Sequence, residues 1–122
     1  MTHPHLHHVA LRTRDVAALT HFYRSLLGLT IVREQAGYSV WLSLGDAVLM
    51  IERRADGEPE IPAGSMELTA FSVTSEGRDR VREWLRARGV AIESETAFTT
   101  YFRDPDGRRV GVSTYALPHA GG

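Results

Sequence analysis

The stretch LHHVALRTRDVAALTHFYRSLLGL, residues 6–29, changes its apolar period part-way along and predicts a strand followed by a helix. Residues 6–13 alternate between apolar and polar side chains, as in a strand with one buried face. After Asp15, which is placed to cap a helix, apolar side chains recur at spacings of three and four. Gly28 then predicts a left-handed end to that helix.

Three further strands are expected after this helix. Residues 29–34, 38–45 and 47–54 are rich in β-branched and aromatic side chains and are separated by the short turn sequences QAG and GD. The first half of the chain therefore has the predicted order βαβββ.

The same order begins again after the loop RADGEPEIPAGSM, residues 54–66, which has no apolar period. The sequence beyond it predicts a strand, a helix and three strands, at residues 68–73, 76–89, 90–95, 98–103 and 108–115. Ser75 is placed to cap this second helix. Its apolar stripe consists of Val81, Trp84 and Leu85. The predicted fold class is α+β, built from two βαβββ modules.

Length and composition limit the architecture and the partners. A chain of 122 residues suits a single domain, with module one at about 6–54, a linker at about 55–66 and module two at about 67–116. The net charge of -1 gives no basic surface for nucleic acid or an anionic membrane. No cysteine is present and no apolar run reaches membrane-spanning length, so we expect a cytoplasmic protein that binds neither nucleic acid nor membrane.

Each predicted strand has an apolar face that should cover a helix and an opposite face that is left free. The residues expected to cover the helices are Val9, Leu11, Val40, Leu42, Leu44, Leu49, Ile51, Phe71, Val73, Phe98, Phe102, Val110 and Val112. The opposite faces mix aromatic, charged and small side chains, a mixture typical of the wall of a ligand site. The expected ligand-binding residues there are Arg12, Trp41, Met50, Leu68, Tyr101, Arg103, Gly111 and Tyr115.

The chain resembles the vicinal oxygen chelate superfamily, which includes glyoxalase I, extradiol dioxygenases and bleomycin resistance proteins. The resemblance rests on residues 6–29, on VLMIE at 48–52 and on YFRDPDGRRVGV at 101–112. It implies paired modules whose strands form a curved, cup-like mixed sheet with the helices on its outer face. Because two chains complete the cup in many members, it also implies a homodimer.

The resemblance further implies metal ligands from the first and last strands of each module. In module one these positions correspond to His8 and Glu52, whereas the corresponding positions of module two are Leu68 and Gly111, whose side chains cannot bind a metal. The site is therefore partial, and no cofactor is expected, with a divalent metal as the alternative. A one-residue slip that turns Glu67 inward, or a bridging ligand from a substrate, would complete it.

Two functional classes follow from these residues. The favoured one is a small-molecule-binding protein similar to the bleomycin resistance type, with an aromatic ligand stacked on Trp41, Tyr101 or Tyr115 and with room for it above Gly111. The alternative is a metal-dependent lyase, isomerase or dioxygenase in which His8 and Glu52 are catalytic. The same residues could also have structural roles alone. His8 and Glu52 could form a hydrogen-bonded pair, Arg12 could be solvated instead of contacting an anion, and the aromatic side chains could simply pack across the strands.

Overall fold

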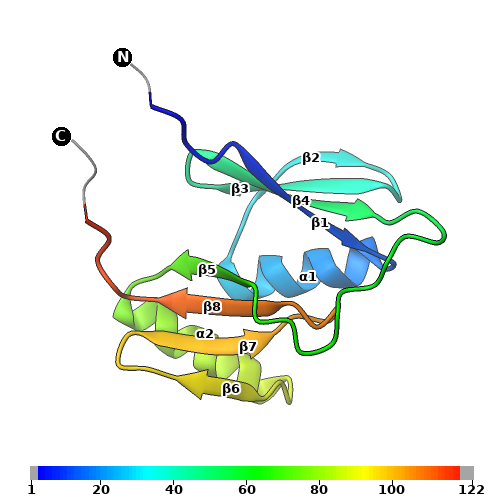
Figure 1. The fold of residues 1–122 in the computed structure, drawn as a ribbon. Coiled ribbons are helices and arrows are strands. Elements are labelled where there is room, and N and C mark those ends of the chain that lie inside the picture. The colour runs from blue at the N-terminus through cyan, green and yellow to red at the C-terminus, as the bar shows by residue number, and fades with distance from the viewer. Residues whose placement is uncertain (1–2, 119–122) are drawn as a thin grey trace. The chain divides into compact units, whose positions relative to one another are not determined.

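The computed structural model describes residues 3–118. The elements in that range follow the order β1 (His8–Thr13), α1 (Val16–Leu27), β2 (Ile31–Gln35), β3 (Ser39–Leu44), β4 (Ala47–Arg53), β5 (Leu68–Ser72), α2 (Ser75–Ala87), β6 (Ile92–Glu95), β7 (Thr99–Arg103) and β8 (Arg109–Ser113). The predicted βαβββ order is confirmed in both halves (Figure 1). Two compact units divide between Glu60 and Ile61, inside the predicted linker.

Module one is a mixed sheet with strand order β1-β4-β3-β2, and α1 packs on one of its faces against β3 and β4 (Figure 1). The side chain of Asp15 accepts a hydrogen bond of 3.0 Å from the backbone N–H of Ala18, which confirms the predicted cap. Gly28 ends the helix with a φ of 68°, a conformation that suits glycine because it has no Cβ. Both predicted ends of this helix are therefore confirmed.

Module two repeats this arrangement in the order β5-β8-β7-β6, with α2 on one face. The prediction that Ser75 caps α2 is wrong, because the side chain of Thr74 accepts the hydrogen bond from the backbone N–H of Gly77. Ser75 is instead the first residue of the helix. Within residues 3–118, neither helix is long and apolar enough to span a membrane.

The buried faces of the sheets agree with the predicted helix-covering set at its centre. The members of that set whose side chains are exposed by 7% or less are Leu11, Val40, Leu42, Leu49, Ile51, Phe71, Phe102, Val110 and Val112. Phe98 is an error in that set, since its side chain is 47% exposed and lies before β7 begins. Its place in the core is taken by the fully buried Thr100, two residues later on the same side of the strand.

Candidate functional site

The face of the module one sheet opposite α1, called free face one below, carries the first group of candidate residues. Its members are His8, Ala10, Arg12, Ser39, Trp41, Ser43, Val48, Met50 and Glu52. Strand pairing arranges them in rows, since Ala10 pairs with Met50 and Met50 pairs with Trp41. The next row joins Arg12 to Glu52 and Glu52 to Ser39.

Arg12 is held by two carboxylates of its own module. Its guanidinium donates to Glu58 over 2.8 and 3.2 Å and to Glu52 over 3.3 Å. These charge-assisted contacts raise the pKa of Arg12, first through Glu58, and they lower the pKa of Glu58 to about 2. Arg12 therefore fastens the loop after β4 to the edge of free face one.

His8 and Glu52 are not brought together within module one. His8 is exposed, and its Nδ1 lies 2.9 Å from Nδ1 of His7. It pairs with Val48 on β4, whereas Glu52 lies four residues further along that strand, or roughly 13 Å away at the usual rise per residue. The nearest diagonal neighbour of His8 on β4 is Met50.

The two sheets carry one aromatic side chain each at an equivalent central position. Trp41 pairs with Met50 on free face one, and Tyr101 pairs with Gly111 on the corresponding face of module two. The guanidinium carbon of Arg33 lies 4.8 Å from the centre of the indole ring, and that of Arg109 lies 4.2 Å from the centre of the phenol ring. Both rings are half-buried, and a guanidinium group lies over each of them in a cation–π contact.

The expected room above Gly111 is filled by its neighbours. A Cβ atom at this position would lie 3.3 Å from Thr99 Cγ2, 3.4 Å from Tyr101 Cδ1 and 3.5 Å from Leu68 Cδ1. The missing side chain of Gly111 therefore allows Tyr101 and Leu68 to approach the backbone and opens no space for a ligand. Leu68 itself is 42% exposed at the edge of the same face.

The remaining candidates of module two have other contacts. Arg103 donates to the carbonyl oxygen of Ser65 over 2.6 Å and to the carboxylate of Glu93 over 2.7 Å. Arg103, followed by Arg109, lowers the pKa of Glu93. Tyr115 lies beyond the end of β8 and packs edge-to-face on Phe98, with the ring centres 5.0 Å apart. Neither Arg103 nor Tyr115 belongs to the row of Tyr101 and Gly111.

The family model that matches this chain is the glyoxalase/bleomycin resistance protein/dioxygenase superfamily, over residues 5–112. The chain belongs to this superfamily. Members of this superfamily bind small molecules and often use divalent metals.

Solved structures of this superfamily superimpose on nearly the whole chain. Lactoylglutathione lyase from Agrobacterium tumefaciens is 25% identical, with 89% of this chain and 92% of that one covered and a TM-score of 0.68. The fosfomycin resistance protein FosX from Mesorhizobium loti is 18% identical, with 96% of each chain covered and a TM-score of 0.73. A glyoxalase/dioxygenase from Nostoc punctiforme is 22% identical, with 88% of each chain covered and a TM-score of 0.74. The last two likenesses show the shared fold.

The side chains at the metal positions of the glyoxalase superfamily do not fit a metal here. No group of three or more histidine or acidic side chains converges within residues 3–118. Strand pairing makes Leu68 the counterpart of His8, because each begins the first strand of its module. It also makes Ser113, and not Gly111, the counterpart of Glu52. No step of chemistry can therefore be assigned to a metal held by His8 and Glu52.

Sequence reasoning did not identify the contribution of Glu58, Arg33 and Arg109. Glu58 lies in the loop assigned to the linker, where no period marks a residue as functional. Arg33 sits opposite Trp41 on the neighbouring strand, so the pairing of β2 with β3 would have indicated it if the register had been known. Arg109 pairs with Leu68 and Arg103, so its contact with Tyr101 could likewise be inferred only from the strand register.

The ion pair of Arg12 and Glu58 predicts a loss of stability in acid. Because the pKa of Glu58 falls from 4.5 to about 2 on folding, its contribution is complete above pH 4.5 and disappears as the pH falls towards 2. We expect Glu58→Gln to lower the urea midpoint at about pH 6 and to have a smaller effect at about pH 3, where part of the contribution is already lost. Glu67→Gln, an exposed residue in module two, is the control. A deficit that is equal at both pH values would contradict the ion pair.

Proposed function

We propose that this member of the glyoxalase superfamily is a small-molecule-binding protein that works without a metal. It binds a planar, aromatic compound on free face one and on the corresponding face of module two. The observation that carries the proposal is the pair of equivalent rings, Trp41 and Tyr101, each half-buried beside a guanidinium group. A planar ligand gains stacking and dispersion energy from such rings, and an electron-rich ligand also gains from the cations.

The environment of Glu52 supports binding over acid–base chemistry. A general base needs a carboxylate with access to the proton that it removes. The side chain of Glu52 is 18% exposed, and Arg12 donates to its Oε1 over 3.3 Å. His8 lies at the other end of free face one. The two groups of the catalytic alternative are thus separated, and one of them is engaged in an ion pair.

The effect of Trp41→Ala on ligand affinity tests this function. For a compound found in a thermal-shift screen, we expect the variant to weaken binding by about 1–2 kcal/mol, the value of one aromatic contact with its buried area. Binding should also quench the fluorescence of Trp41, and Trp84→Phe should preserve this signal because Trp84 lies on α2. The measurement is a fluorescence titration of the wild type and both variants.

Glu52→Gln separates the binding protein from the enzyme. The binding function predicts an affinity close to that of the wild type, since the substitution preserves the shape of the side chain. An enzyme that uses Glu52 would bind the compound normally and lose turnover by roughly 10²-fold or more. Turnover in the wild type that is lost only in Glu52→Gln would overturn the proposal.

We also propose that the protein is a cytoplasmic homodimer, as the superfamily and the aromatic side chains on the free faces suggest. Native mass spectrometry of the untagged protein should give the mass of two chains at micromolar concentration and no bound Zn, Ni, Mn or Fe. A single-chain mass would contradict the dimer.

Metal at one per chain that survives removal of His3 and His5 but disappears in His8→Ala would contradict metal-free binding.

A further inference from the structure

A groove on the helix side of module one, on the opposite side of the sheet from free face one, is separate from the proposed site. It runs between α1 and the edge strand β2 and has a volume of about 630 Å³, within the usual range for small-molecule sites. Apolar side chains from both elements form its floor, among them Val16, Ile31 and Val40. Thr20 and Glu34 supply polar groups from the helix and the strand.

Thr20 carries the first indication of a ligand. Its side chain lines the groove and is only 8% exposed. Its Oγ1 is buried and has no hydrogen-bond partner among the described residues. A buried hydroxyl without a partner is destabilising, so the unpaired Oγ1 of Thr20 needs an explanation. A ligand in the groove would provide the missing partner.

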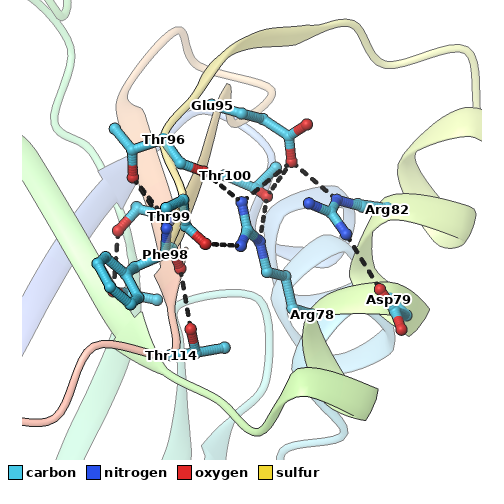
Figure 2. A network of polar contacts seen from close by, with 11 residues as sticks. Arg78, Asp79, Arg82, Glu95, Thr96, Phe98, Thr99, Thr100 and Thr114 are labelled. Carbon is cyan, nitrogen blue, oxygen red and sulfur yellow. Dashed lines mark hydrogen bonds and ion pairs between the residues drawn. The ribbon is translucent and has the colours of Figure 1, made fainter.

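The equivalent place in module two is filled by the protein itself. Arg78 of α2 is 7% exposed and donates to Thr100 Oγ1 over 2.9 Å and to the carbonyl oxygens of Ala97 and Thr96 over 2.8 and 2.9 Å (Figure 2). Its guanidinium also lies 3.4 Å from the carboxylate of Glu95. A buried cation therefore occupies the space between α2 and the β6–β7 hairpin.

The strand pairing and the helix caps relate the two places residue by residue. Counting from the caps Asp15 and Thr74, Leu19 of α1 corresponds to Arg78 of α2, because each is four residues after its cap. Glu34 corresponds to Glu95, since Glu34 pairs with Val40 and Glu95 pairs with the equivalent Thr100. Module one thus has a carboxylate at the same position as module two, but a leucine where module two has the buried arginine.

The carboxylate of Glu34 consequently has no cation to match the one in module two. It makes no hydrogen bond or ion pair with any other residue between 3 and 118, whereas Glu95 contacts both Arg78 and Arg82. Leu19 is 1% exposed and packs in the core, and it is not among the residues that line the groove. Arg24, one turn beyond Thr20 on α1, lines the groove as well.

We propose that this groove binds a small molecule with an apolar body and a cationic amidinium, guanidinium or ammonium group, which takes the place that Arg78 occupies in module two. The cation pairs with Glu34, the apolar body packs against Val40 and Ile31, and a polar atom of the ligand bonds to Thr20 Oγ1.

Benzamidine and benzamide form a matched pair of probes for this site, because they share shape and differ in charge. Titrations of ¹⁵N-labelled protein should give benzamidine a Kd on the order of 1 mM, as expected for a ligand of this size. Amide shift changes should concentrate in α1 and β2. Benzamide should bind about tenfold more weakly, since it lacks the charge-assisted contact.

Isosteric variants assign the contacts. Glu34→Gln should weaken benzamidine about tenfold, and Thr20→Val should weaken it severalfold while removing the unpaired hydroxyl. Glu83→Gln, an exposed acidic residue on α2, should have no effect. Equal affinity for the two probes, an unchanged affinity in Glu34→Gln, or shift changes confined to another part of the molecule would each overturn the proposal, whatever the outcome at the free faces.

Discussion

Arg78→Met is expected to lower the free energy of unfolding of module two by about 2–4 kcal/mol, the largest effect of any substitution considered for this protein. The methionine fills a similar volume, but it cannot donate to Thr100 or to the carbonyl oxygens of Ala97 and Thr96 (Figure 2). The buried Thr100 would then lose a partner, and Glu95 would keep only one of its two arginines. Urea denaturation followed by Trp84 fluorescence on α2 measures the change.

Two further variants separate the network from general effects of arginine on the helix. Arg86→Met changes an exposed residue near the end of α2 and should alter stability by no more than about 0.5 kcal/mol. Arg78→Lys keeps the charge but lacks the planar fork, so it should recover only part of the loss. An Arg78→Met midpoint equal to that of Arg86→Met would show that the buried contacts do not stabilise the module.

Gly111→Val is expected to destabilise module two by about 1–3 kcal/mol, because its methyl groups would collide with side chains that already fill the space. Thr99, Tyr101 and Leu68 all lie within 3.5 Å of the position that a Cβ atom would take. The variant should also displace the Tyr101 ring and weaken any ligand stacked on it. Thermal unfolding and the fluorescence titration measure the two consequences.

Ala70→Val is the matched control for Gly111→Val. Ala70 pairs directly with Gly111 and is exposed, so the same enlargement there points into solvent. We expect it to change the free energy of unfolding by no more than about 0.5 kcal/mol. If Gly111→Val were as stable as Ala70→Val, the position above Gly111 would be open, as the sequence alone had suggested.

The repeated βαβββ order could be predicted because each element has its own periodicity. The strict spacing of apolar residues in α1, with Asp15 before it and Gly28 after it, predicts the helix and both of its ends. The second helix was harder, because TS at residues 74–75 offers two adjacent capping residues of similar strength. Of its expected stripe, Val81 and Leu85 are buried, but Trp84 is only half-buried beside Arg88.

Arg78 could not be predicted as a core residue from pattern alone. An arginine three residues before Val81 lies on the buried stripe of α2, but an isolated arginine is far more often exposed. Its burial is favourable because the β6–β7 hairpin supplies two carbonyl groups, the hydroxyl of Thr100 and the carboxylate of Glu95, which tertiary structure brings to it. The pattern wrongly predicts Phe98 as a core residue, because an aromatic residue at a strand boundary carries no sign of where pairing begins.

The candidate site depended on strand register, which the sequence does not mark. The alternation identifies the faces correctly, so Arg12, Trp41 and Glu52 do share one face. It does not say which residue stands opposite which, and this led to the wrong equivalence of Glu52 with Gly111. A shift of two residues preserves the face and changes every neighbour along it. The alternation of side chains also does not predict close contacts such as those of Arg12 with Glu58.

The parallel pairing of β1 with β4, in which His8 meets Val48, has a consequence for how the chain acquires its structure during synthesis. The first strand has no backbone partner within residues 3–60 until the last strand of its module has left the ribosome, whereas β2, β3 and β4 can form hairpins one after another. Module one therefore closes late, in a single step over a long loop, and such closures are slow. During this interval β1 is a strand without a backbone partner, and unpaired strands are vulnerable to pairing with other chains.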